Sequence, residues 1–266
     1  MTLPSPTRRN CAVITGASSG IGEALAEGLA RRGYSLILVA RRANRLQKLA
    51  DRLGDEHGVC TEIRGCDLVD RGARAELTDD LATRDVAILC NNAGFATYGN
   101  LARLNQQQEI SEVELNCVAV HQLTLAVLPA MVERKGGAIL ITGSTAGNQP
   151  GPGNTTYAAT KAFANTFAES LHTELSGTGV TCTLLAPGPV RTEFGQVAGL
   201  ANLERLLPNP LWVSAPQAAD AAIAAMAKGK RRVAPGAFAK AQTLGGQYTP
   251  RAIIGPLLHK VYGKVT

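Results

Sequence analysis

The 266-residue chain lacks several features that mark special classes of protein. No stretch approaches the roughly eighteen apolar residues of a membrane-spanning helix, and no long apolar run follows the first nine residues as in a secretory signal. The six cysteines show no CxxC or metal-finger spacing, and the four histidines form no HExxH motif. We therefore expect a cytoplasmic protein with reduced thiols and without a bound metal.

Aromatic residues make up only 4% of the chain, whereas the net charge is +6. A basic protein can bind nucleic acid, but these arginines occur as short pairs and the chain offers few stacking platforms for bases. Neither nucleic-acid binding nor integral membrane association is therefore expected. A nucleic-acid or membrane-surface binder, suggested by the net charge and the tail Ile253–Lys264, is kept as an alternative.

The chain does contain short apolar runs that alternate with helical patterns, as in repeated strand–helix units. Strands are expected at residues 11–15, 35–40, 61–66, 86–90, 138–142 and 180–186. Helices are expected at 20–32, after the second strand up to about residue 53, at 106–133 and at 157–176. Because the strands are continuously apolar, we predict an α/β fold: a single-domain, Rossmann-type doubly wound parallel sheet with helices on both faces. One domain should span residues 1–266, with a flap at about 191–215 and a C-terminal extension at about 237–266.

A glycine cluster lies between the first predicted strand and the first predicted helix, with the sequence Thr-Gly-Ala-Ser-Ser-Gly-Ile-Gly at residues 15–22. Gly16 permits a tight turn, Gly20 lets the backbone approach a pyrophosphate, and Gly22 allows close packing of helix on sheet. The exposed amides at the helix start favour phosphate. The cluster predicts a dinucleotide site, and turn glycines without a ligand are the alternative.

The end of the second predicted strand indicates which dinucleotide would fit. A site for NAD usually places an acid there to bind the ribose 2′-hydroxyl, but this chain has Arg41 and Arg42. A guanidinium can bind a 2′-phosphate through two parallel hydrogen bonds. We therefore predict NADP(H), although both arginines could instead be solvated surface residues.

Tyr157 and Lys161 are four residues apart and share one face of a predicted helix. A nearby ammonium is expected to lower the tyrosine pKa from its usual value near 10 towards the working range. Ser144 ends the preceding strand, so its hydroxyl should lie at the same carboxyl edge. A YxxxK pattern also occurs by chance in many helices.

Together these motifs identify a resemblance to the short-chain dehydrogenase/reductase family, from about Ala12 to at least Val233. The matching segments are TGASSGIG (15–22), CDL (66–68), NNAG (91–94), LNCVAV (115–120), ITGSTAG (141–147), YAATK (157–161) and PGPVRTEF (187–194). The resemblance implies that Ser144 polarises a substrate carbonyl and Tyr157 transfers the proton. It implies that Lys161 binds the nicotinamide ribose and lowers the tyrosine pKa, and that Asn116 holds a water linking the lysine to solvent.

The resemblance also implies a set of cofactor-binding residues. It places Asp67 at the adenine ring, Asn91 and Gly94 at the adenosine ribose, and 187–192 over the nicotinamide, with Thr192 reaching the carboxamide. The complete set is Gly16, Ser18, Ser19, Gly20, Ile21, Gly22, Arg41, Arg42, Asp67, Leu68, Asn91, Asn92, Ala93, Gly94, Tyr157, Lys161, Pro187, Gly188, Val190 and Thr192.

The chain departs from the family after residue 230, where a paired-glycine motif usually helps to build a tetramer. Here the sequence is Arg-Arg-Val-Ala-Pro-Gly at 231–236, so tetramer assembly by that route is in doubt and a homo-oligomer, dimer or tetramer, is expected.

Apolar residues at helical spacing follow Thr192, and they predict a flap over a hydrophobic carbonyl substrate, a bulky ketone or a 3-oxoacyl thioester. They could equally pack on the domain itself or on a partner subunit. The predicted function is an NADP(H)-dependent oxidoreductase that interconverts a carbonyl and a secondary alcohol. A non-catalytic NADP(H)-sensing protein is the alternative.

Overall fold

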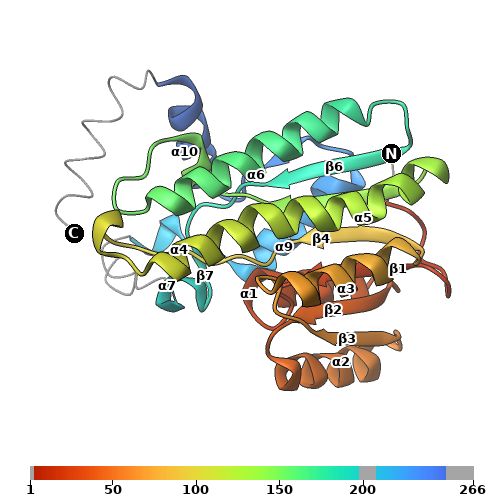
Figure 1. The fold of residues 1–266 in the computed structure, drawn as a ribbon. Coiled ribbons are helices and arrows are strands. Elements are labelled where there is room, and N and C mark those ends of the chain that lie inside the picture. Colours follow the sequence, from red (N-terminus) through yellow and green to blue (C-terminus); the bar gives the residue numbers. More distant parts are fainter. Residues whose placement is uncertain (1–2, 198–207, 250–266) are drawn as a thin grey trace.

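A computed structural model describes residues 3–197 and 208–249, and within them a seven-stranded parallel sheet forms the centre of the molecule (Figure 1). The strand order is β3-β2-β1-β4-β5-β6-β9. The strands are β1 (Cys11–Thr15), β2 (Ser35–Ala40), β3 (Thr61–Gly65), β4 (Val86–Asn91), β5 (Gly137–Thr142), β6 (Val180–Leu185) and β9 (Arg232–Val233). The order reverses between β1 and β4, where an open sheet of this kind leaves a crevice for ligands.

Helices cover both faces of the sheet, as the continuously apolar strands predict. On one face lie α1 (Gly20–Ala30), α2 (Ala43–His57) and α9 (Ala215–Ala227). On the other lie α3 (Arg71–Ala82), α5 (Val120–Glu133) and α6 (Thr155–Glu174). Each set of helices buries an apolar cluster against its own face, so the fold class and the layered arrangement predicted from the sequence are confirmed.

One long helix differs in detail from the prediction. The expected helix at 106–133 is made of α4 (Gln106–Val113), a π-helical segment η2 (Glu114–Ala119) and α5. By length and composition alone it is apolar enough to cross a membrane, but only one such helix is found among the described residues. The core helix of a soluble protein passes the same test, and α5 packs on α3 and β4.

The segment expected to form a flap has both of its ends in the described structure. β7 (Val190–Arg191) pairs in parallel with β8 (Val213–Ser214), so the beginning and the end of the excursion are joined. Between them lie the short helix α7 (Phe194–Val197) and a 3-10 turn, η4 (Asn209–Leu211). Half of the apolar residues on which the flap prediction depends lie outside the described residues, namely Leu200, Leu203, Leu206 and Leu207.

The described part of the predicted C-terminal extension is a helix, α10 (Ala237–Tyr248), while residues 250–266 lie outside the described residues. α10 packs against η3 (Thr145–Asn148), the turn that follows β5. Thr145 Oγ1 donates to Gln242 Oε1 over 3.0 Å. The helix therefore supports the loop after Ser144 from outside. The assignment of all 266 residues to one domain stays a prediction.

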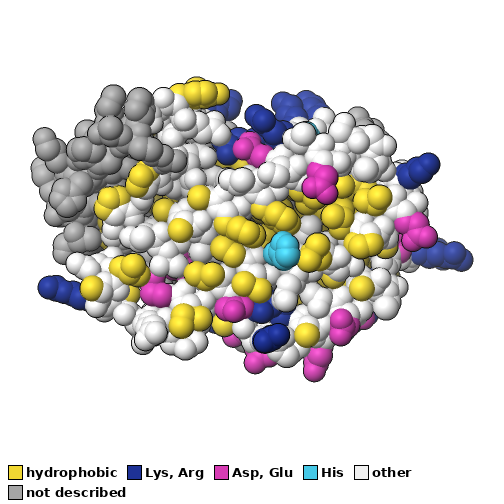
Figure 2. Space-filling view, turned by 45° about the horizontal axis from the view of Figure 1, so that its top comes forward, with side chains coloured by type: hydrophobic (Ala, Val, Ile, Leu, Met, Phe, Trp, Pro, Cys, Tyr) yellow, Lys and Arg dark blue, Asp and Glu magenta, His cyan; other side chains and the backbone are white. Residues whose placement is uncertain are grey.

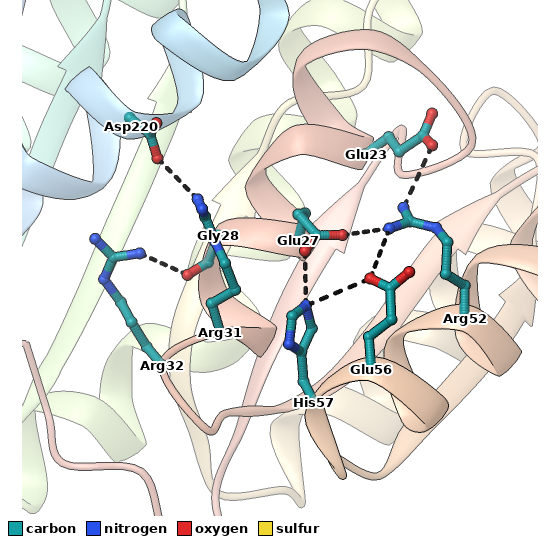
Figure 3. Close-up of polar contacts among 9 residues, drawn as sticks. All are labelled: Glu23, Glu27, Gly28, Arg31, Arg32, Arg52, Glu56, His57 and Asp220. Atoms are coloured by element: carbon teal, nitrogen blue, oxygen red, sulfur yellow. Dashed lines mark hydrogen bonds and ion pairs between the residues drawn. The ribbon is translucent and has the colours of Figure 1, made fainter.

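Ion pairs join α1 to α2 (Figure 3). Arg52 pairs with Glu27 at 2.5 Å and with Glu56 at 3.3 Å, and the His57 ring nitrogen Nε2 lies 2.6 Å from Glu27. The ligand atoms of Glu27, Glu56 and His57 lie within 4.8 Å of one another, close enough to hold a metal ion. The guanidinium of Arg52 already neutralises both carboxylates, so the network is explained as a link between helices.

Hydrophobic side chains spread over the face on which α5 and α6 lie, with few charged side chains among them (Figure 2). The exposed large hydrophobic residues of α4, α5 and α6 are Ile110, Val113, Leu125, Val132 and Phe163. An apolar surface of this kind is typical of a protein–protein contact.

Candidate active site

The glycine-rich loop has the tight geometry that its sequence predicts. Gly16 and Gly20 have positive φ angles of 69° and 60°, which L side chains rarely adopt. A Cβ on Gly16 would lie 2.9 Å from the Cα of Ala93, and one on Gly22 would lie 2.2 Å from the carbonyl oxygen of Gly16. The loop therefore packs directly on the segment after β4, and its own backbone lies against the first turn of α1 at Gly22.

Residues 91–94 close the site from β4, but their side chains differ in direction. Thr15 Oγ1 accepts hydrogen bonds from the backbone amides of Asn92 and Ala93, each over 2.9 Å. The Asn92 side chain donates to Thr15 O, also inside the protein. Asn91 is 2% exposed and donates to Thr124 Oγ1 on α5 over 3.0 Å, so only its backbone can line a ribose pocket.

Arg42 and the two serines of the glycine loop lie together at the end of β2. Arg42 Nη2 donates to Ser18 Oγ over 2.9 Å and to Ser19 Oγ over 2.8 Å. Arg42 Nη1 donates to Glu193 Oε2 over 2.9 Å, and Arg45 Nη1 contacts both oxygens of the same carboxylate. The hydrogen bonds from these arginines lower the pKa of Glu193.

Arg41, the other predicted phosphate ligand, is exposed and makes no side-chain hydrogen bond or ion pair within residues 3–197 and 208–249. The sequence did not indicate either Arg45 or Glu193 as part of this site. The two arginines are therefore not equivalent, because Arg42 is already bound to protein oxygens.

Arg74 fixes the loop after β3 by a hydrogen bond. This loop holds the predicted adenine contacts Asp67 and Leu68. Asp67 accepts from the amide of Val69 over 3.1 Å, and Arg74 donates to Leu68 O over 2.6 Å. The Arg74 side chain is 2% exposed and pairs with Glu114 of η2 at 2.8 Å. A buried arginine thus links the loop to the segment that carries Asn116.

Ser144, Tyr157 and Lys161 meet at the carboxyl edge of β5, as the spacing predicts. Ser144 is 8% exposed and is the N-cap of η3, where Oγ accepts from the amide of Ala146 over 3.1 Å. Tyr157 makes a side-chain hydrogen bond with Ser144. Lys161 is 4% exposed; its Nζ donates to Thr142 O over 2.8 Å and lies 5.7 Å from the centre of the Tyr157 ring.

The pKa of Tyr157 differs from the prediction. Burial of the phenol raises its pKa to about 12, although the hydrogen bond with Ser144 lowers it, and the charge of Glu112 raises it further. Burial also lowers the pKa of Lys161 to about 8. The sequence predicted that the tyrosine pKa is lowered, and this is wrong because burial is the largest influence on the phenol and raises its pKa.

Asn116 lies in the π-helical segment and is 1% exposed. Its Nδ2 donates to Phe95 O over 2.9 Å and to Thr160 Oγ1 over 3.1 Å. A Cβ on Gly94 would lie 3.0 Å from Asn116 Oδ1 and 3.4 Å from Lys161 Nζ. Gly94 is therefore required where asparagine and lysine approach each other, and a π-helical turn is common at functional sites.

Glu112, one turn before Asn116, is a buried acid that sequence reasoning missed. It is 0% exposed, and Oε2 accepts from the amide and the hydroxyl of Thr97, over 3.0 and 2.8 Å. Its Oε1 has no hydrogen-bond partner among the described residues. Burial raises its pKa to about 7, Thr97 lowers it, Glu109 raises it and Lys161 lowers it.

The segment after β6 crosses the site. Pro187 O accepts from the amide of Thr145 over 3.0 Å, which joins it to the turn after Ser144. Gly188 packs on Ala239 of α10, and Val190 begins β7. A Cβ on Gly20 would lie 2.9 Å from the methyl carbon of Thr192. Among the predicted nicotinamide contacts, Thr192 thus lies against the glycine-rich loop.

Known proteins resemble this chain in sequence and in fold. The profile of the short chain dehydrogenase family matches residues 10–201. An NADP-dependent 3-hydroxy acid dehydrogenase of Escherichia coli K12 is 38% identical over 189 residues, which cover 70% of this chain and 75% of that protein. Aligned segments cover between 60% and 75% of the curated relatives' length.

Several solved structures match nearly the whole chain, among them the following two. A short-chain dehydrogenase from Sphingobium yanoikuyae in complex with NADPH is 33% identical, with a TM-score of 0.78 over 97% of this chain and 95% of that one. A bulky-bulky ketone specific alcohol dehydrogenase from Comamonas testosteroni is 29% identical, with a TM-score of 0.76 over 97% and 93%. The fold and the site define a dinucleotide-dependent class of oxidoreductase. The chain belongs to the short-chain dehydrogenase/reductase family.

Proposed function

We propose that this protein is an NADP(H)-dependent oxidoreductase that interconverts a carbonyl and a secondary alcohol. The observation that carries the proposal is the meeting of Ser144, Tyr157 and Lys161 beside a glycine-rich loop. They lie at the carboxyl edge of the sheet, and the strand order reverses nearby, between β1 and β4. The family supplies the general reaction, and the arginines after β2 support the phosphorylated cofactor.

The residues fit a dinucleotide in three respects. The positive φ angles and close packing of Gly16 and Gly20 leave no room for side chains where a pyrophosphate would approach. The chain places Arg41 and Arg42, and no acid, directly after β2, and the exposed Arg41 is available to bind a 2′-phosphate. Lys161 can reach a ribose hydroxyl from its position beside Gly94.

The chain's own residues supply position and proton transfer. A bound nicotinamide supplies hydride chemistry in this family, and the protein contributes orientation and electrostatics. Ser144 would donate a hydrogen bond to the carbonyl oxygen and polarise it. Tyr157, neutral because burial raises its pKa, would give its proton to that oxygen in reduction. Lys161 and Asn116 would lie on the path along which Tyr157 regains its proton.

For the substrate we propose a hydrophobic ketone or a 3-oxoacyl compound. A groove of about 420 Å³ borders the first turns of α6, and its lining residues, among them Pro150, Pro152 and Ala158, carry no charge. Phe194 of α7 lies against Tyr157, with ring centres 5.7 Å apart, so an apolar side chain also adjoins the phenol. The bulky-ketone specificity of the Comamonas testosteroni enzyme supports this substrate class, whereas the 3-hydroxy acid relative favours a smaller acid.

Cofactor titration tests the proposal first. We expect NADPH to bind at least tenfold more tightly than NADH, and Arg41→Asp to remove most of that preference. Arg8→Asp, the same charge reversal at the opposite edge of the sheet, should leave it unchanged. Equal affinities in the parent protein would contradict the NADP(H) preference. Purified protein with NADPH should then be screened against ketones, aldehydes and acyl thioesters, including a homologous ketone series.

A non-catalytic NADP(H)-sensing protein would bind the cofactor equally well but show no turnover with any carbonyl in that panel. The preserved Ser144, Tyr157 and Lys161 favour the enzyme. We further propose a homo-oligomer that buries the apolar face of α5 and α6, which light scattering on the parent and on Leu125→Glu would test. Tetramer assembly and a cytoplasmic location stay predictions.

A further inference from the structure

Three consecutive residues after β7 contact three separate parts of the candidate site. Thr192 lies against the glycine-rich loop, with its methyl carbon 2.9 Å from where a Cβ of Gly20 would be. Glu193 binds the arginines at the start of α2. Phe194 packs on the ring of Tyr157. The position of one short segment is therefore tied both to the expected phosphate pocket and to the tyrosine.

Glu193 supplies a negative charge that the start of α2 otherwise lacks. No acidic residue occupies the first turn of α2, whose N-terminus attracts anions. Glu193 Oε2 lies 2.9 Å from Arg42 Nη1, and Arg45 Nη1 lies 2.7 Å from Oε1 and 2.9 Å from Oε2. A carboxylate held by two guanidinium groups is an anion bound to a preformed site.

A 2′-phosphate of the cofactor would need the same donors. The Nε and Nη2 donors of Arg42 are directed at Ser18 and Ser19, which leaves Nη1 for an anion, and Glu193 already binds there. Two anions cannot share these arginines without mutual repulsion. The exposed side chain of Arg41 offers the phosphate a first contact that needs no displacement.

We propose that Glu193 is an internal anion that occupies Arg42 and Arg45 until a 2′-phosphorylated dinucleotide displaces it. The inference rests on the proposed NADP(H) function and names a residue that limits the strength of cofactor binding. A dinucleotide without the phosphate leaves the ion pairs intact. Glu193 thus makes the position of Thr192 and Phe194 depend on which cofactor is bound.

The variant Glu193→Gln tests the proposal, because it keeps the size of the side chain and removes its charge. Dissociation constants for NADPH and NADH are measured by fluorescence titration, with 2′,5′-ADP and 5′-AMP as probes without nicotinamide. We expect affinity for NADPH and 2′,5′-ADP to rise about three- to tenfold, since two partly exposed ion pairs no longer compete. Affinity for NADH and 5′-AMP should change less than about twofold.

Glu56→Gln is the matched control. Glu56 also pairs with an arginine of α2, and its side chain is 49% exposed against 44% for Glu193, but it lies at the other end of the helix (Figure 3). The Glu56→Gln substitution removes the same charge and should change neither the affinity for NADPH nor the affinity for NADH. A second readout is hydrogen exchange of the segment 190–197, which should differ between the NADPH and NADH complexes of the parent and not in Glu193→Gln.

Three results would overturn the proposal: an unchanged NADPH affinity in Glu193→Gln, a lower one, or an equal change for both cofactors. A lower affinity would mean that Glu193 holds Arg42 in place for the phosphate. Failure of the proposed function is recognised separately, because it appears in the parent protein as equal binding of NADPH and NADH, before any variant of Glu193 is compared.

Discussion

The side chain of Asn165 fills the space that Gly143 leaves empty. A Cβ at Gly143 would lie only 2.0 Å from Asn165 Oδ1. From this position Asn165 holds the backbone of Ser144 on both sides: Nδ2 donates to Ser144 O over 2.9 Å, and Oδ1 accepts from Ser144 N over 3.3 Å. Asn165 is 4% exposed, so these bonds are made in the protein interior.

Gly143→Ala should therefore destabilise the protein by about 1–3 kcal/mol, because the added methyl group pushes Asn165 away from Ser144. Turnover should fall with it. Asn165→Ala alone should also be destabilising, since it leaves buried backbone groups without partners. Urea unfolding of the two single variants and the double variant measures their coupling. We expect the double variant to be more stable than the sum predicts by about 1 kcal/mol, and strict additivity would refute the steric argument.

Tyr157→Phe should lower kcat by at least about a hundredfold and leave the NADPH dissociation constant within about twofold, since only the proton donor is removed. Lys161→Ala should impair both, because the buried ammonium lies beside Tyr157 and Gly94. Steady-state kinetics on a substrate from the carbonyl screen, with cofactor titration, measures this. Tyr248→Phe, at a side chain that is 77% exposed, is the control. A Tyr157→Phe variant with near-parental turnover would show that another group supplies the proton.

Glu112 should make the protein less stable as the pH rises from about 4.5 to 7. Burial raises its folded-state pKa to about 7 from 4.5, so the folded state binds a proton that the unfolded state has lost. Stability from this group is complete below pH 4.5 and falls through that window, by up to about 3 kcal/mol. The groups that influence its charge are Glu109, Lys161 and Thr97.

Urea unfolding of the parent and of Glu112→Gln between pH 4 and 8 tests this expectation. The stability difference between them should move in favour of the glutamine variant as the pH rises, because glutamine does not ionise. Glu76→Gln, an exposed change on α3, should show no such trend. Parallel pH curves for the parent and Glu112→Gln would mean that the carboxyl group is not held in its neutral form.

Arg74→Met should cost about 3–5 kcal/mol, because it removes the charge partner of Glu114 and leaves Leu68 O and Gln122 without their donor. The midpoint temperature of thermal unfolding should fall by about 2–4 °C for each kcal/mol of stability lost. Arg31→Met breaks an ion pair with Asp220 in which both side chains are more than half exposed, and it should cost about 1 kcal/mol at most. Similar losses in the two variants would contradict the role given to the buried arginine.

The sequence predicts the strands and the glycine-rich loop of this protein better than the contacts among its buried polar side chains. Apolar runs at 35–40 and 11–15 give the bounds of β2 and β1 directly, because buried parallel strands need continuous hydrophobic residues. The glycine-rich loop is equally predictable, since its spacing follows from backbone contacts at Gly16 and Gly22. Helix α3, which begins at its N-cap Asp70, was not predicted, because its apolar periodicity is weak.

The residues that sequence reasoning missed act across large distances in the chain. Glu193 lies 148 residues from Arg45, and no local pattern joins them. Glu112 reads as a surface acid of an amphipathic helix until the fold places Thr97 against it. The predicted direction of the Tyr157 pKa was wrong for a related reason. Sequence spacing predicts which side chains are neighbours, but not how deeply the phenol is buried.

The π-helical turn at Glu114–Ala119 has a consequence for insertions and deletions in this helix. Each residue of an α-helix turns the chain by about 100°, so a one-residue deletion that restored regular winding would rotate everything on one side of it. Asn116 would then leave Thr160 and Phe95, or α5 would present a different face to β4. The length of this segment is therefore as constrained as its residue types, and length variation among relatives should fall in loops elsewhere.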